Sequence, residues 1–214
     1  RPSSRVRDYV AILRKILRDE KPDYIGVAWD VDDDTTLRKQ KFADYKANRA
    51  PMPSDLAEQI ALVHEACEAL GVQVLTYAGF EADDVIGTLA MRSSAEGRPV
   101  TIVTGDKDFF QLVNDDTGIR VFNPRDDGTW YDAAGVKDKF GVAPDQVVDV
   151  LALMGDAIDN IKGVPGIGEK GARDLISTHG SLDALLENAA SLPQKKHREA
   201  LLAHADAARE SRTL

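Results

Sequence analysis

The chain has 214 residues, 43% hydrophobic and 29% charged, which is enough apolar material for one mid-sized domain or a domain with a small appendage. No apolar run approaches the roughly 18 residues of a membrane helix. The single cysteine, Cys67, excludes a disulfide framework or a thiolate zinc site. We expect it to be a buried thiol in a reducing, cytoplasmic setting. The net charge of −9 argues against nucleic-acid binding unless the acidic side chains are gathered at a metal site.

Hydrophobic periodicity divides the first part of the chain into alternating helices and strands. Apolar residues recur at helical spacing over three segments, residues 5–20, 55–70 and 81–93. Apolar runs predict strands, the first and third of them buried, over residues 24–29, 72–75, 99–104 and 119–122. The alternation predicts an α/β fold with a largely parallel sheet.

The pattern changes along the second part of the chain. The polar stretch 31–54 is too long for an ordinary loop and is expected to carry irregular helix. Beyond residue 143 we expect helix over 145–154, a glycine-rich hairpin over 163–168, and helix through residue 209, without strands. The predicted organisation is a catalytic domain over residues 1–142 and a helical subdomain over residues 143–214.

Three groups of acidic residues follow strands or open a helix, namely Asp30, then Glu81, Asp83 and Asp84, then Asp106 and Asp108. Ligands of open α/β sheets bind at the carboxyl ends of the strands, so all three groups can reach one edge. Each group alone is better explained as turn or helix-capping residues. Together they are costly, because two like charges 4 Å apart repel by about 4 kcal/mol at an effective dielectric constant of 20. Bound cations or protons would offset that repulsion.

The candidate ligands are all oxygen atoms, with no histidine or cysteine nearby, which selects Mg²⁺ or Mn²⁺ over zinc. Two such ions are the usual means of hydrolysing a phosphodiester bond. Asp156 and Asp159 add a further acidic pair, and their spacing of three places both on one side of a helical turn. The alternative is a pair of ordinary turn acids.

Two segments suit phosphate binding. The hairpin sequence GVPGIGEKGA, residues 163–172, combines glycines, a helix start and Lys170. A plain tight turn is the alternative. The polar stretch contains an aromatic residue among cations, which suits a single nucleic-acid strand, although a solvated basic face remains open. Its residues are Arg38, Lys39, Lys41, Tyr45, Lys46 and Arg49.

These motifs occur in a fixed order. Trp29-Asp30 and DYKANR are followed by GFEADD, TGDKD, GDAIDN and GVPGIGEKGA. The set closely resembles the 5′-nuclease (flap endonuclease-like) family, and within it the N-terminal domain of bacterial DNA polymerase I. The resemblance runs across nearly the whole chain. It implies a PIN-like α/β core followed by a helix–hairpin–helix-type (helix-3-turn-helix) subdomain.

The resemblance also implies roles for particular residues. One metal site would use Asp30, Glu81 and Asp83 with Asp84 nearby, and the other Asp106, Asp108, Asp156 and Asp159. Catalysis would involve Asp30, Asp83, Lys46 and Arg49, of which the last two steer the scissile phosphate. The DNA-binding residues would be Arg38, Lys41, Tyr45, Lys46, Arg49, Gly163, Gly166, Gly168 and Lys170. Tyr45 would stack on a base, and the hairpin would bind the duplex backbone and a K⁺ ion.

The implied activity is structure-specific 5′-3′ exonuclease and flap endonuclease hydrolysis of DNA with two or more Mg²⁺ ions, for which Mn²⁺ can substitute. The substrates would be branched or flapped DNA and RNA primer strands. The family's opening strand, which ends in an aspartate, is absent, so we expect the chain to be a piece of a larger polymerase. The resemblance also implies a cytoplasmic, nucleoid-associated location. Two alternatives stay open: a DNA-binding module without catalysis, and a PIN-type ribonuclease.

Overall fold

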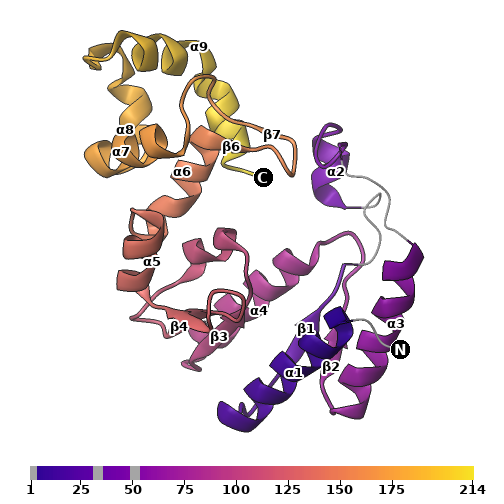
Figure 1. The fold of residues 1–214 in the computed structure, drawn as a ribbon. Helices are drawn as coiled ribbons and strands as arrows, with labels where there is room; N and C mark the ends of the chain where they lie inside the picture. Colours follow the sequence, from indigo (N-terminus) through magenta and orange to yellow (C-terminus); the bar gives the residue numbers. More distant parts are fainter. Residues whose placement is uncertain (1–3, 31–35, 49–53) are drawn as a thin grey trace. The chain divides into compact units, whose positions relative to one another are not determined.

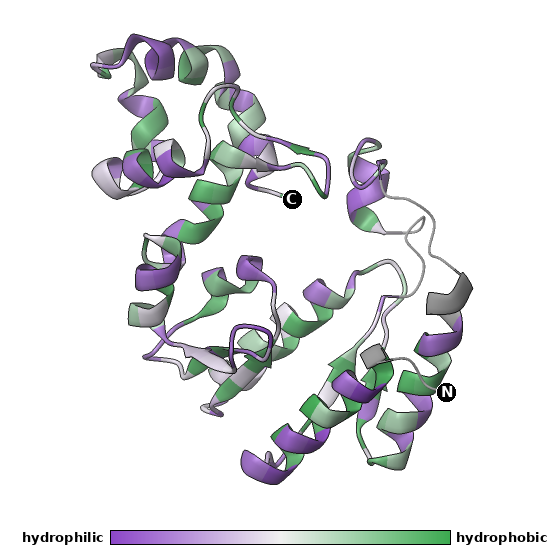
Figure 2. Cartoon of the chain, viewed as in Figure 1, coloured by the Kyte–Doolittle hydropathy of each residue, from purple (hydrophilic) through white to green (hydrophobic). Residues whose placement is uncertain are grey.

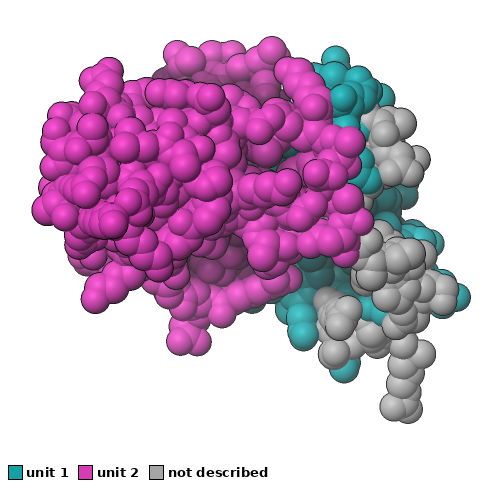
Figure 3. All heavy atoms as spheres, turned by 90° about the horizontal axis from the view of Figure 1, so that it is seen from above, with its two compact units in different colours: residues 1–40, 50–86 teal, residues 41–49, 87–214 magenta. Residues whose placement is uncertain are grey.

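The computed structural model describes residues 4–30, 36–48 and 54–214, with the side chains of residues 4, 5 and 54–57 left out. The chain forms two compact units (Figure 3). The first comprises residues 1–40 and 50–86, and the second comprises residues 41–49 and 87–214. None of the helices in the described ranges is long and apolar enough to span a lipid bilayer.

The first unit packs helices against a short parallel strand pair (Figure 1). Its elements are α1 (Ser4–Asp19), β1 (Gly26–Ala28), most of α2 (Leu37–Lys41), α3 (Ser54–Ala69) and β2 (Gln73–Leu75). β1 and β2 pair in parallel, with Val27 opposite Val74. Helices α1 and α3 turn their apolar faces to one core, because residues three and four apart share a face of a helix. The buried members of that core are Val6, Leu13, Val63, Cys67 and Val72.

The second unit begins with a three-stranded sheet. Helix α4 (Ala82–Ala95) starts in the first unit and enters the second at Gly87. The sheet elements that follow are β3 (Val100–Val103), β4 (Ile119–Asn123) and β5 (Thr129–Tyr131). β3 and β4 are parallel, and β4 and β5 are antiparallel. The connecting helices are the 3-10 helix η2 (Lys107–Leu112), the helix α5 (Ala133–Phe140) and the 3-10 helix η3 (Pro144–Gln146).

The remainder of the second unit is mainly helical. Its elements are α6 (Val147–Met154), β6 (Gly155–Asp156), β7 (Ile161–Lys162), α7 (Glu169–His179), α8 (Leu182–Glu187), η4 (Ala189–Ser191) and α9 (Lys195–Ser211). Hydrophobic segments of these helices are coloured green in Figure 2. Val150, Leu153, Ile176 and Leu201 are fully buried. Buried Asp149 accepts a hydrogen bond from the Leu182 N–H at 2.8 Å, so its charge is not left unpartnered in the core.

The predicted helices over residues 5–20, 55–70 and 81–93 are confirmed, as are the strands over 72–75, 99–104 and 119–122. Cys67 is fully buried and free, as predicted. The strands predicted over 24–29 and 99–104 exist, but their predicted burial was wrong. Gly26 is exposed and its neighbours are only half-buried, and within β3 only Ile102 is buried while Thr101 and Val103 are exposed. The expectation of no strands beyond residue 143 was also wrong, since β6 and β7 form a short antiparallel pair.

Candidate active site

The first group of predicted carboxylates lies around the amino end of α4. Asp30 follows β1, and its Oδ1 accepts a hydrogen bond from the Ala82 N–H at 2.6 Å. The N–H of buried Glu81 donates to Asp84 Oδ2 at 3.1 Å. Asp83 is exposed in the first turn. Amides at a helix start lack partners within the helix, so Asp30 and Asp84 satisfy that local need besides any ligand role.

Arg38 links two members of this group, Glu81 and Asp84. Its guanidinium makes two parallel bonds to Asp84, at 2.6 and 2.7 Å, and a longer one to Glu81 at 3.5 Å. Such paired bonds are the strong form of an arginine–carboxylate contact. Arg38, predicted to bind DNA, and Asp84, predicted to lie near a metal, are therefore bonded to each other here. Both roles stay predictions.

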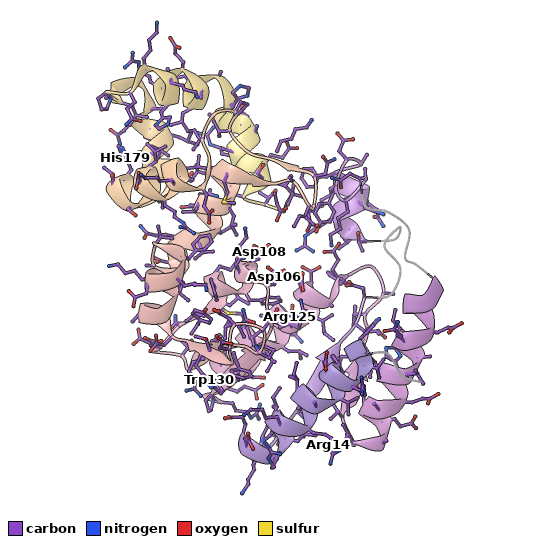
Figure 4. All side chains as sticks on the ribbon, in the orientation of Figure 1. Arg14, Asp106, Asp108, Arg125, Trp130 and His179 are labelled. Carbon is purple, nitrogen blue, oxygen red and sulfur yellow. The ribbon has the colours of Figure 1, made fainter. Side chains whose placement is uncertain are left out.

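The second group lies where β3 ends, and Figure 4 shows Asp106 and Asp108 there side by side. Asp106 caps the 3-10 helix η2, because its Oδ1 accepts a hydrogen bond from the Asp108 N–H at 2.9 Å. The Asp106 N–H in turn donates to Thr104 Oγ1 at 3.0 Å. The local fold thus fixes both acids at the strand end, as the sequence predicted from the TGDKD motif.

Asp108 is the most perturbed acid in this group. Burial and the neighbouring charge of Asp106 raise its pKa from 3.8 to about 7, and Lys107 offsets part of that shift. Asp156 and Asp159 raise the pKa further. Asp108 Oδ1 is buried and has no hydrogen-bond partner in the described structure. The negative charge of an ionised Asp108 is therefore not compensated. A proton or a bound cation can compensate it.

Asp156 and Asp159 lie on what we call the carboxylate hairpin, Gly155–Lys162, which consists of β6, its turn and β7. Asp156 Oδ1 accepts hydrogen bonds from the Ile158 N–H at 2.7 Å and from the Asp159 N–H at 3.4 Å. The predicted helical turn is therefore wrong: the side chain of Asp156 closes a tight turn between two strands. The electrostatic effect of both acids on Asp108 nevertheless joins the two predicted acidic pairs of this unit.

Part of the polar stretch, residues 44–48, lies against the carboxylate hairpin within the second unit. The Lys46 N–H donates to the Asp159 carbonyl at 2.9 Å. Lys46 is buried, with its Nζ 5.0 Å from the centre of the Tyr45 ring. Tyr45 is only 5% exposed, so its ring presents no open face for a base here. Base stacking by Tyr45 stays a prediction that would require this segment to move.

Three cations of this stretch remain, Lys39, Lys41 and Arg49. Lys39 lies on α2 and is half-buried. Lys41 is the last residue of α2 and is exposed. Arg49 lies outside the described residues. Asn48 and Asn160 were not predicted from the sequence, and their side chains bridge residues 44–48 and the carboxylate hairpin. No periodicity or motif signals a side-chain amide that reaches a carbonyl more than 100 residues away.

The glycines of the predicted phosphate-binding hairpin have different roles. A Cβ on Gly163 would lie 2.3 Å from the backbone carbon of Met154, so its small size is required by packing. Gly166 has a φ of +83°, and a Cβ there would lie 2.9 Å from Lys196 Cε. Gly168 precedes α7 and has open space around it. Lys196, a residue of α9, thus lies next to the hairpin. It was not predicted from the sequence.

The donor chemistry of these acids fits a hard divalent cation. The predicted ligands are oxygen atoms, and the buried Asp108 Oδ1 is an acceptor without a donor. In the described part of the chain, however, no three His, Cys, Asp or Glu side chains are gathered closely enough to hold a metal ion. The acids of the second unit thus have the charge and the chemistry for a cation without forming a closed cage.

Comparison with known proteins identifies the family. Residues 1–141 match the family model of the 5′-3′ exonuclease N-terminal resolvase-like domain, and residues 142–214 match that of the 5′-3′ exonuclease C-terminal SAM fold. DNA polymerase I of Chloroflexus aurantiacus is 42% identical over 217 residues, covering 100% of this chain and 23% of that protein. DNA polymerase I of Pseudomonas aeruginosa is 45% identical over 196 residues, covering 91% of this chain and 21% of that protein. The chain spans less than a quarter of the length of these curated relatives.

Solved structures agree on the fold. A structure of T5 5′-exonuclease with bound zinc ions has a TM-score of 0.81 and 23% identity, covering 99% of this chain and 80% of that chain. A complex of the bacteriophage T5 flap endonuclease with DNA and metal ions has a TM-score of 0.80 and 22% identity, with the same coverage. These likenesses confirm the predicted fold class. Since the two family models together match residues 1–214, the chain belongs to the 5′-3′ exonuclease family.

Proposed function

We propose that this chain is the metal-dependent nuclease part of a DNA polymerase I. It would hydrolyse the 5′ strand of branched or flapped DNA, including RNA primer strands, and leave a 5′-phosphate and a 3′-hydroxyl. Family membership and the polymerase relatives support the reaction class. Mg²⁺ is the proposed ion, with Mn²⁺ as a substitute, because the donors are carboxylate oxygens.

The observation that carries this proposal is the environment of Asp108. A half-buried acid whose pKa is raised to about 7 by burial of its carboxyl group and by neighbouring acids is a poor structural residue, because its ionised form destabilises the fold around it. Strongly perturbed carboxylates are common at catalytic sites for that reason. Asp106 and Asp108 would hold a divalent cation, which would supply Lewis-acid activation of water and of the phosphate.

The residues of the chain supply the remaining parts of the reaction. Asp106 and Asp108, held at the end of β3, would bind the cation, and the acids of the carboxylate hairpin would complete its surroundings. Lys46 lies beside that hairpin and would neutralise the charge that develops on the phosphate oxygens. We assign Asp30, Glu81 and Asp83 to a second metal site, with Arg38 holding Glu81 and Asp84 in place.

Duplex DNA would bind to the glycine-rich hairpin, residues 163–168, which we call the glycine hairpin. The amides around Gly168 and the start of α7 suit a phosphate. The exposed side chain of Lys170 and that of Lys196 add positive charge close to these amides. Binding and chemistry would therefore depend on different residues, which makes them separable by mutation.

The decisive experiment measures flap cleavage in Mg²⁺ by the Asp106→Asn and Asp108→Asn variants. We expect each kcat to fall by about 100-fold or more, since each variant removes a group that stabilises charge at the reacting phosphate. Duplex affinity should survive. The control is Asp138→Asn, an exposed acid on α5. Unchanged turnover in both acid variants would refute the proposed site.

One observation favours a second candidate, a DNA-binding module without catalysis. The described side chains do not form a ready metal cage. The same assay separates the two functions: a binding module would retain duplex affinity and would show no Mg²⁺-dependent cleavage in the unmodified protein.

A further inference from the structure

Lys46 is attached to the carboxylate hairpin by more than its own backbone. The Asn48 Nδ2 donates to the Ala157 carbonyl at 3.0 Å. In the opposite direction, the Asn160 Nδ2 donates to the Asp44 carbonyl at 2.6 Å. With the bond from the Lys46 N–H to Asp159, residues 44–48 and 157–160 are joined by reciprocal contacts that span more than 100 residues of sequence.

The backbone at this junction is held in an uncommon conformation. Lys46 has a φ of +55° and Asn160 a φ of +58°. In the described chain, only two other non-glycine residues have a positive φ, Lys21 and Asp127. Asparagine tolerates the left-handed region, but lysine adopts it at a cost unless its surroundings hold it there. The three bonds across the junction are such surroundings, so the position of Lys46 depends on them.

We propose that Asn48 and Asn160 are positioning residues that fix Lys46 relative to the hairpin acids Asp156 and Asp159. Lys46, which would contact the phosphate, and the two acids, which would bind the metal, would then be held in place relative to each other before substrate binds. Prior assembly matters because a displacement of about 1 Å can reduce a rate by about 100-fold. This inference rests on the proposed nuclease function for its kinetic consequence, but not for its structural one.

Two variants of Asn160 isolate the side-chain donor. Asn160→Gly keeps a backbone that tolerates a positive φ and deletes the amide. Asn160→Asp keeps the shape and replaces the donating NH₂ by an oxygen that cannot donate. Asn48→Asp removes the other bond at an exposed side chain, where unfolding is not expected. The matched control is Asn188→Asp. The Nδ2 of Asn188, which follows the last residue of α8, donates to the Ala184 carbonyl at 2.8 Å.

The first measurement needs neither metal nor substrate. In metal-free protein, we expect the Lys46 amide to exchange with deuterium about tenfold faster or more in the Asn48 and Asn160 variants, because its bond to Asp159 is no longer supported. The second measurement is flap cleavage in Mg²⁺, where kcat should fall by about 10- to 100-fold while KM changes by less than about threefold. The Asn188 variant should match the unmodified protein in both.

Wild-type exchange of the Lys46 amide in all three variants would overturn the inference. So would a wild-type kcat in both Asn160 variants, provided the unmodified protein cleaves. If the unmodified protein does not cleave flap DNA, the proposed function fails, and the exchange measurement still decides whether the two asparagines hold Lys46.

Discussion

At the scale of single residues, Asp108 shows how one side chain can connect electrostatics to function. Its neighbours Asp106, Asp156 and Asp159 all raise its pKa. A folded protein that contains no compensating ion keeps this arrangement only at a cost in stability above the pKa. That cost gives a measurable signature of the site that does not depend on catalysis.

We therefore predict a pH-dependent stability difference between the unmodified protein and Asp108→Asn in the absence of metal. The folded pKa of Asp108 is about 7 and its ordinary value is 3.8, so the folded state binds the extra proton between these values. The stabilisation from that proton is complete below about pH 4 and is lost as the pH rises through 7, by at most about 1.4 kcal/mol per pH unit. The variant should gain relative stability over that range.

Urea unfolding at pH 5, 6, 7 and 8 in the presence of a chelator measures this difference. Asp138→Asn, at an exposed position, is the control and should show a constant difference. A constant difference for Asp108→Asn as well would mean that the carboxyl is not buried among charges as described.

Residue types and their order were enough to predict where two acids of the candidate site lie. Asp106 and Asp108 were predicted at a strand end, and they lie there. The pairing of Arg38 with Asp84 was not predicted, because sequence gives no direction to a side chain 46 residues away. The bonds of Asn48 and Asn160 were not predicted either, because they go to backbone carbonyls, which every residue type carries.

At the scale of elements, the long helices were predictable and the two-residue strands β6 and β7 were not. α1 and α3 extend over several turns, so their apolar positions repeat often enough to be recognised. β6 and β7 contain two residues each, too few for any alternation. The spacing of Asp156 and Asp159 was therefore attributed to a helix although the backbone reverses direction there.

The glycine hairpin yields a stability prediction at this scale. Gly163→Ala should destabilise the protein by about 1–3 kcal/mol or more, because the added Cβ would lie 2.3 Å from the Met154 backbone, which cannot move aside cheaply. Gly168→Ala should be close to neutral, since its φ is −90° and no atom lies within 4 Å of the new Cβ. Thermal unfolding compares the two. Equal losses would contradict the packing role of Gly163.

The junction of α9 with this hairpin yields a binding prediction. Lys196→Gln should weaken duplex DNA binding and reduce the slope of log affinity against log salt by about 1, as expected for the loss of one phosphate contact. Lys195→Gln is the matched control, because Lys195 is 77% exposed and pairs with Glu199 at 3.8 Å. If the slope of log affinity against log salt is unchanged in Lys196→Gln, this lysine does not contact a DNA phosphate.

At the scale of the whole molecule, the net charge of −9 conflicts with DNA binding only if the charge is treated as uniform. The second unit places acids at the end of β3 and on the carboxylate hairpin, and places lysines at the glycine hairpin and α9. A phosphate backbone responds to the charges within about one Debye length, roughly 10 Å at 0.1 M salt. Local acids should therefore affect DNA binding more than distant ones.

A pair of double variants tests this distinction. Asp106→Asn with Asp108→Asn should raise the affinity for duplex DNA in the presence of a chelator while abolishing cleavage in Mg²⁺. Asp138→Asn with Asp145→Asn makes the same change in net charge at exposed positions and should alter neither property. Fluorescence anisotropy at several salt concentrations measures the affinities. Equal gains in both double variants would mean that DNA responds to net charge alone, and the acids at the end of β3 would then need no special position relative to the bound strand.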